Sequence, residues 1–276
     1  MPIASVDLEV RWWWQANPFV TLKILTNGLI EKSAASTELE ISRCIATTDP
    51  NSEGLRYLRT VLNSFEVVGP DSTHVGLVYA PMRESVSRFQ RRLSNSQIPG
   101  YFLKPLLAMV LTGLDHLHTK CRVIHTGTQL VGNKSSLQDE TDLAIVDLKP
   151  DNILLGIEHP AVIEDLVNDE AEEPTPRKME GSRAIYPSRN FGDLQSPPGP
   201  PKIADFGLAV LGDVPQLHNH PIQADLFQAP EVILRAGWTY SVDIWNLGVM
   251  VSVPLAPPQF LRNRIDVDTL KALGPS

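Results

Sequence analysis

The stretch that decides the fold is Asp147-Leu148-Lys149-Pro150-Asp151-Asn152, which places a carboxylate, an amine and an amide within six residues. Further along the chain stands Asp205-Phe206-Gly207, which directly follows the short apolar run Ile203-Ala204. Ala229-Pro230-Glu231 comes next. Any one of these short motifs by itself would be a chance match in most proteins. Three of them in this order, each in a suitable context, form a strong signal.

The three stretches match the catalytic loop D-L-x-x-x-N, the metal-binding D-F-G and the A-P-E of protein kinases. Residues from about 18 to 250 resemble a eukaryotic protein kinase, and several details resemble the SR-protein-kinase (SRPK-like) family and its fungal relatives. These details are His125-Thr126 in place of His-Arg, Ala236-Gly237-Trp238, Val242-Asp243-Ile244-Trp245, and a long spacer before D-F-G. The resemblance implies an α+β, two-lobed fold that handles ATP and Mg²⁺.

The resemblance also implies roles for the polar residues of these motifs. Asp147 would be the catalytic base that accepts the proton of the substrate hydroxyl, and Lys149 would neutralise the transferring phosphate. Asn152 and Asp205 would hold Mg²⁺, which prefers oxygen ligands and keeps part of its water shell.

A lysine on an early strand completes the expected nucleotide site. Lys23 stands in Val-Thr-Leu-Lys, where V-A-I-K is usual, and would bind the α- and β-phosphates. Glu40 lies 17 residues further on in the next predicted helix and would be its ion-pair partner. Glu38, on another face of that helix, is the alternative.

The adenine ring is expected between apolar surfaces, with Leu154 as the floor and Tyr79 as the gatekeeper. The backbone groups of Ala80 and Met82 would hydrogen-bond the edge of the ring. For Leu154 and Met82, ordinary packing is an equally good interpretation. Asp243 is expected to anchor the catalytic loop from the helix below it.

The hydrophobic pattern predicts the elements around these motifs. They are a strand over 20–25, a helix over 36–46, a strand pair at 65–68 and 75–79, and a long core helix over 101–119.

Both ends of the domain depart from the kinase pattern. Residues 1–82 are interpreted as a truncated N-lobe without the glycine-rich loop, because the first glycine is Gly28, after the lysine strand. Trp12-Trp13-Trp14 stands in the expected place of that loop. Residues 83–276 are interpreted as a truncated helical C-lobe, because only 26 residues follow Met250.

Two segments interrupt the predicted C-lobe. Deleting 127–146 restores the uninterrupted phrase Val-Ile-His-Thr-Asp-Leu-Lys-Pro-Asp-Asn, so the segment is either a translated intron or gene-model error, or a loop that bulges from an intact core. Residues 157–201 are first acidic and then rich in Pro and Ser, which predicts a flexible spacer.

Composition limits the partners. A net charge of −8 argues against direct nucleic-acid binding and leaves basic peptides as partners, including Arg/Ser-rich protein substrates by family analogy. Cys44 and Cys121 have no metal-ligand spacing. The sequence shows no signal peptide and no apolar stretch long enough to span a bilayer, which favours an intracellular protein, cytoplasmic or nuclear.

Two functional hypotheses remain beside each other. The first is a serine/threonine protein kinase, favoured because all the named polar catalytic residues are present. The second is a pseudokinase or scaffold with a kinase fold, or a non-functional fragment, favoured by the missing glycine-rich loop. Residues 208–228 contain no Ser, Thr or Tyr, so a phosphate on this segment cannot control activity.

Overall fold

A computed structural model describes residues 19–25, 28–68, 73–93, 96–129, 144–146, 148–181, 183–223 and 227–255. The tryptophans at 12–14, the predicted base Asp147 and the residues after Leu255 therefore lie outside the described part of the chain.

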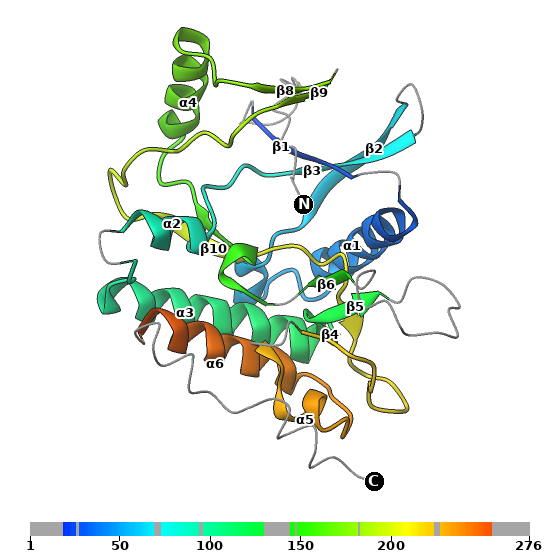
Figure 1. Cartoon of the computed structure of the whole chain (residues 1–276). Helices are drawn as coiled ribbons and strands as arrows, with labels where there is room; N and C mark the ends of the chain where they lie inside the picture. The colour runs from blue at the N-terminus through cyan, green and yellow to red at the C-terminus, as the bar shows by residue number, and fades with distance from the viewer. Residues whose placement is uncertain are drawn as a thin grey trace.

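The first part of the fold is an antiparallel sheet with one helix against it (Figure 1). Strands β1 (Thr21–Ile24), β2 (Val61–Val68) and β3 (Thr73–Tyr79) lie in the order β1-β3-β2. The predicted strand pair is confirmed, with Phe65 opposite Gly76. Lys23 stands opposite Leu77, so the central strand β3 fixes the position of the lysine.

Helix α1 (Leu29–Thr47) follows β1 and is longer than the predicted span of 36–46. It starts directly after Gly28, and no residue from Leu29 to Ala35 disfavours a helix strongly. Its buried positions recur at helical spacing on one face of the helix: Ala35, Glu38, Ile41, Ser42 and Ile45. A short 3₁₀ turn, Glu53–Tyr57, connects α1 to β2.

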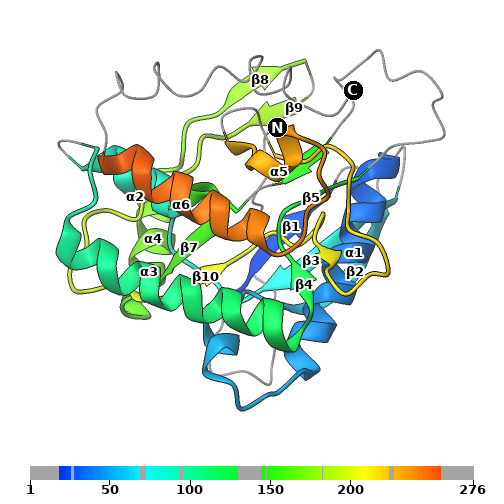
Figure 2. The same ribbon diagram turned by 90° about the horizontal axis from the view of Figure 1, so that it is seen from below.

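The second part of the fold is built on α3 (Gly100–Asp115), which continues into a π-helical turn at His116–Lys120. This confirms the predicted core helix. Helix α6 (Ser241–Leu255) lies alongside α3, as both ribbon views show (Figures 1 and 2). Helices α2 (Val86–Arg92) and α5 (Pro230–Ile233) are shorter.

Short antiparallel strand pairs hold the motifs between the two parts. β7 (Ile153–Gly156) pairs with β10 (Gly199–Ile203), and β4 (Val123–Ile124) pairs with β11 (Val210–Leu211). The predicted insertion at 127–146 begins and ends as a third pair, β5 (Gly127–Gln129) with β6 (Ala144–Val146). The two ends of the segment therefore lie side by side.

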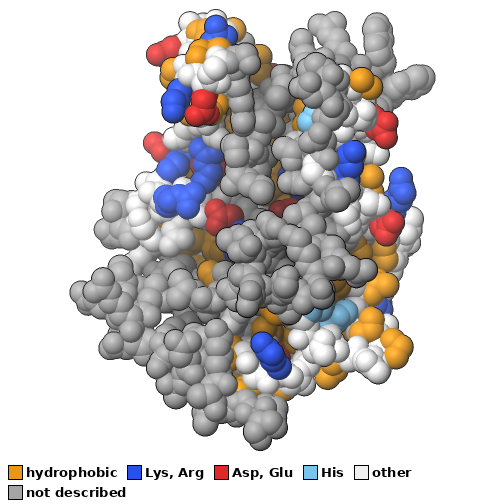
Figure 3. All heavy atoms as spheres, turned by 45° about the vertical axis from the view of Figure 1, so that its right-hand side comes forward, with side chains coloured by type: hydrophobic (Ala, Val, Ile, Leu, Met, Phe, Trp, Pro, Cys, Tyr) orange, Lys and Arg blue, Asp and Glu red, His pale blue; other side chains and the backbone are white. Residues whose placement is uncertain are grey.

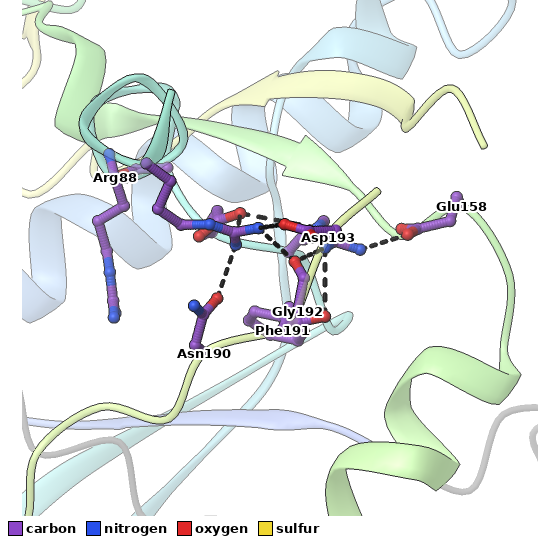
Figure 4. A network of polar contacts seen from close by, with 10 residues as sticks. Arg88, Glu158, Asn190, Phe191, Gly192 and Asp193 are labelled. Carbon is purple, nitrogen blue, oxygen red and sulfur yellow. Dashed lines mark hydrogen bonds and ion pairs between the residues drawn. The ribbon is translucent and has the colours of Figure 1, made fainter. Parts of the chain in front are cut away.

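The segment 157–201 has more structure than a flexible spacer, which corrects that expectation. It forms α4 (Ala161–Glu172) and the hairpin of β8 (Lys178–Glu180) and β9 (Arg183–Ile185). The buried guanidinium of Arg83 pairs with Glu158 and donates to the Gly192 carbonyl at 2.7 Å. Arg92 donates to the same carbonyl (Figure 4). These contacts fasten both ends of the segment to the chain around α2.

One apolar cluster joins the two parts of the fold. It includes Ile45 of α1, Leu58, Leu114 of α3, Ile203 and Phe206, each buried to 1% exposure or less. Burial on this scale is the main favourable term in folding. Within the described residues, no helix is both long and apolar enough to cross a membrane.

Candidate functional site

Lys23 is the centre of the polar site between the two parts of the fold. Its Nζ donates to Glu38 Oε2 at 2.8 Å and to Asp205 Oδ1 at 2.9 Å. The second oxygen of Glu38 accepts from the hydroxyl of Tyr79 at 2.5 Å. The site therefore joins β1, α1, the end of β3 and the D-F-G stretch.

The partner of Lys23 is Glu38, and the prediction of Glu40 was wrong. Glu38 lies on the buried face of α1 at 2% exposure, whereas Glu40 is exposed to solvent. Two positions along a helix correspond to a rotation of about 200°, so Glu40 cannot share the face of Glu38. The signal was present in the sequence, because Glu38 falls in register with Ala35, Ile41 and Ile45.

Burial and charge act in opposite directions on the ionisable groups of this site. Burial would lower the pKa of Lys23, but the carboxylates of Glu38 and Asp205 outweigh it and raise that pKa above its ordinary value. Burial would raise the pKa of Asp205, but Lys23, then His125 and Lys149, hold it below its ordinary value. Both side chains of the 2.9 Å pair are therefore charged at neutral pH.

Asp205 itself has an unusual backbone. Its φ of 69° lies in the left-handed region, which non-glycine residues rarely occupy. The preceding residue is held on both sides, since Ala204 N donates to Asn152 O at 2.9 Å and Ala204 O contacts His125 Nε2 at 3.0 Å. These contacts fix the peptide that carries the Asp205 carboxylate beside the turn that carries Asn152.

Asp243 anchors the catalytic-loop region from α6, as expected. Its carboxylate is fully buried and accepts from the backbone N–H groups of His125 at 2.8 Å and Thr126 at 2.9 Å. Thr126 Oγ1 in turn accepts from Asn246 Nδ2 at 2.9 Å and from the backbone N–H of Leu148 at 3.4 Å. Thr126, which precedes the 127–146 segment, and Leu148, which follows it, are thus held at one place.

Residues flanking Asp147 can be placed although Asp147 itself lies outside the described residues. Leu148 is fully buried, Lys149 is partly buried, and Asn152 is 8% exposed at the end of the 3₁₀ turn Pro150–Asn152. The positive charge of Lys149 contributes to lowering the pKa of Asp205. Lys149 and Asn152 therefore belong to the same polar region as Lys23 and Asp205.

The expected adenine contacts lie along the segment that follows β3. Tyr79 is buried, Ala80 is exposed, and Met82 is partly buried. Leu154 is partly buried on β7, between the buried Ile153 and Leu155, so its side chain lies on the opposite face of that strand. A bridge between Ser85 and Leu154 holds β7 against this segment.

The donor set fits Mg²⁺ held together with a nucleotide. No group of three or more His, Cys, Asp or Glu side chains able to hold a metal ion occurs in the described part of the chain. Mg²⁺ usually takes one or two carboxylates together with waters and phosphate oxygens, so it needs no complete protein cage. Asp205 and Asn152 would supply its protein oxygens, and Lys23 would meet the phosphates.

Arg59 was not identified from the sequence as a residue of this region. It follows the 3₁₀ turn, and its guanidinium reaches both the Tyr79 ring and the Ala80 carbonyl. A lone arginine at a loop position gives no sequence signal for such a contact.

The chain is similar to known serine/threonine kinases. A serine/threonine protein kinase of Aspergillus fumigatus is 33% identical over 235 residues, which are 84% of this chain and 50% of that protein. The serine/threonine-protein kinase SRPK of Physarum polycephalum is 28% identical over 247 residues, 84% of this chain and 53% of that protein. SRSF protein kinase 3 of Mus musculus is 26% identical over 146 residues, 53% of this chain and 22% of that protein.

The chain spans about half the length of the first two relatives. A solved kinase-domain crystal structure matches with a TM-score of 0.53 at 20% identity, over 83% of this chain and 54% of that one. No protein-family model matches. By sequence similarity and by fold, the chain belongs to the protein kinases, and kinases named SRPK and SRSF protein kinase are among its relatives.

Proposed function

We propose that the chain is a serine/threonine protein kinase that transfers the γ-phosphate of ATP to protein hydroxyl groups. The observation that carries the proposal is the convergence of Lys23, Glu38 and Asp205 within hydrogen-bond distance. Phosphoryl transfer depends mainly on positioning and on charges placed around the phosphates, and these residues supply both.

The roles follow from this placement. Lys23, held by Glu38, binds the α- and β-phosphates, and Asp205 with Asn152 holds Mg²⁺. Asp147 accepts the proton of the substrate hydroxyl, and Lys149 stabilises charge on the transferring phosphate.

We further propose Arg/Ser-rich protein substrates. The net charge of −8 and the names of the SRPK and SRSF kinase relatives support this substrate class. On the face drawn in Figure 3, the described Lys and Arg side chains alternate with Asp and Glu side chains. The described side chains of this face therefore form no continuous basic stripe of the kind that binds a nucleic-acid backbone.

Control of this kinase does not require a phosphate on residues 208–228. The segment is instead held by Trp238, whose Nε1 donates to the His220 carbonyl at 2.9 Å and whose ring stacks on His218 at 4.5 Å between centroids. Adding an upstream kinase should leave the activity unchanged; an increase would contradict this part of the proposal.

Single-turnover transfer to an Arg-Ser peptide tests the proposal directly. We expect the unmodified chain to phosphorylate the peptide in a Mg²⁺-dependent manner, and Asp147→Asn and Asp205→Ala to lower the rate by at least about 100-fold. A peptide with Ser replaced by Ala is the control for transfer to the hydroxyl. Equal, near-background rates for all three chains would overturn the enzyme proposal.

A nucleotide-binding scaffold is the second candidate, and it is favoured by one sequence fact. Residues 1–27 contain no glycine, so they offer no glycine-rich loop over the phosphates. A scaffold predicts a Mg²⁺-dependent rise in Tm with ATP but no transfer above background. Transfer that is abolished by Asp147→Asn would exclude it.

A further inference from the structure

Arg59 stands at the edge of the proposed nucleotide site, and its backbone is fixed there. Its N–H donates to the Ile203 carbonyl at 2.8 Å, and the neighbouring Leu58 bridges to the same residue. Ile203 lies two positions before Asp205. The backbone of Arg59 is therefore fastened to the end of β10, two residues before the proposed metal ligand.

The side chain extends from this point toward the segment after β3. Its Nη2 donates to the Ala80 carbonyl at 3.3 Å, and its guanidinium carbon lies 4.4 Å from the centre of the Tyr79 ring. A guanidinium over an aromatic face is attracted by the ring quadrupole. The two contacts together hold the cation across the gatekeeper and against the carbonyl beside it.

The position is poorly hydrated for a cation. Burial lowers the pKa of Arg59, and the opposing effects of Tyr79, Glu38 and Asp205 do not cancel it. Its Nε is buried and has no hydrogen-bond partner among the described residues. A buried donor without a partner destabilises the fold. The hydrogen bond to the Ala80 carbonyl therefore offsets part of the cost of burying the guanidinium.

The backbone of Ala80 is also expected to hydrogen-bond the edge of the adenine ring, and its carbonyl is the backbone group able to accept a hydrogen bond there. The exocyclic amine of adenine is the group of that ring able to donate to a carbonyl. The Arg59 contact and the adenine contact therefore use the same oxygen, and the guanidinium lies against the ring of Tyr79, the expected gatekeeper.

We propose that Arg59 is a specificity-determining residue of the nucleotide site, which competes with the 6-amino group of adenine for the Ala80 carbonyl. The inference rests on the proposed function, because it requires a purine nucleotide at this site. Its consequence is weak selection for the amine: ATP gains little over the same nucleotide without that group.

A comparison of two nucleotides measures the selection for the 6-amino group. Purine riboside triphosphate lacks the 6-amino group and otherwise matches ATP. We expect Mg²⁺ complexes of the two nucleotides to bind the unmodified chain with dissociation constants within about twofold of each other. In Arg59→Met, which keeps an apolar chain of similar length but has no donor, we expect ATP to bind about tenfold more tightly than the analogue.

The ratio of the two dissociation constants distinguishes competition for the Ala80 carbonyl from a general effect of the positive charge of Arg59. Loss of the positive charge alone changes the affinities for both triphosphates alike and leaves their ratio unaltered. Arg56→Met is the matched control, because Arg56 is an exposed arginine three positions away. It should keep the ratio of the unmodified chain. If Arg59→Met does not fold, the ratio measured for the unmodified chain tests the proposed role of Arg59 by itself.

The outcomes separate this inference from the proposed function. A strong preference for ATP in the unmodified chain, or an unchanged ratio in folded Arg59→Met, overturns the role of Arg59 and leaves nucleotide binding standing. Binding of neither nucleotide by either chain overturns both proposals.

Discussion

Lys23 and Asp205 are 182 positions apart in the sequence, yet Lys23 Nζ lies 2.9 Å from a carboxylate oxygen of Asp205. β1 carries the lysine, and the turn after β10 carries the aspartate. The pair therefore crosses between the sheet and the part of the fold built on α3. The proposed site for a nucleotide with its metal depends on the packing of these two parts through one apolar cluster.

Glu38 rather than Glu40 should determine the function of Lys23. Glu38→Gln should lower the single-turnover rate of phosphoryl transfer about 100-fold, because the lysine loses the charge that holds it in place. Glu40→Gln should stay within about twofold of the unmodified chain, since Glu40 is exposed. Equal losses in the two variants would contradict this assignment.

The buried carboxylate of Asp243 should make stability depend on pH. Burial would raise its pKa, but hydrogen bonds and charge from His118, with His125 and Thr126, hold the pKa below its ordinary value. The unfolded chain therefore takes up the proton first as the pH falls. The stabilisation is complete above about pH 5 and is lost as the pH falls below about 4 and through the folded pKa.

Asp243→Asn should accordingly lower the free energy of unfolding by about 3 kcal/mol at neutral pH. The difference in free energy of unfolding between the variant and the unmodified chain should become smaller at the lowest pH at which both chains still fold. Urea unfolding across the pH range measures both quantities. A difference that does not change with pH would show that the charge of Asp243 contributes nothing.

Gly127, the first residue of β5, packs too closely on the D-F-G region to accept a side chain. A Cβ at this position would lie 2.0 Å from the Leu208 carbonyl oxygen, which is backbone and cannot move aside easily. Gly127→Ala should lower the free energy of unfolding by about 2 kcal/mol. Gly248→Ala is the control, because a Cβ there meets nothing within 4 Å. It should stabilise α6 slightly.

Arg83 should be the residue that holds the 157–201 segment in place. Its side chain is fully buried, with Glu158 and the carbonyls of Phe191 and Gly192 as partners. Arg83→Met should raise amide hydrogen exchange over residues 183–193 by at least about tenfold, because the buried acceptors lose their donor. Arg88, which points away from this network in Figure 4, provides the control. Arg88→Met should leave exchange unchanged, and equal protection in both variants would contradict the role of Arg83.

The sequence by itself identified the parts of the site that depend on local patterns. Asp205 and Asn152 were recognisable because fixed short motifs carry them, and Lys23 was recognisable because it stands within a short apolar strand in a motif-like context. The strand pair and the long core helix followed from hydrophobic periodicity, which needs only neighbouring residues. The order of these parts along the chain was enough to predict the fold class.

The tertiary structure decided what depends on contacts between distant segments. The register of Glu38 with apolar residues was already in the sequence, but the contact of Glu38 with Lys23 required α1 to pack that face against the core. The approach of Arg59 to Ala80 required the 3₁₀ turn and the end of β3 to meet. The ordering of 157–201 required Arg83 to find partners more than seventy positions away. Short-range patterns record which groups a chain carries, but packing of the whole chain determines which of those groups meet, because burial and charge pairing act between residues that the sequence keeps apart.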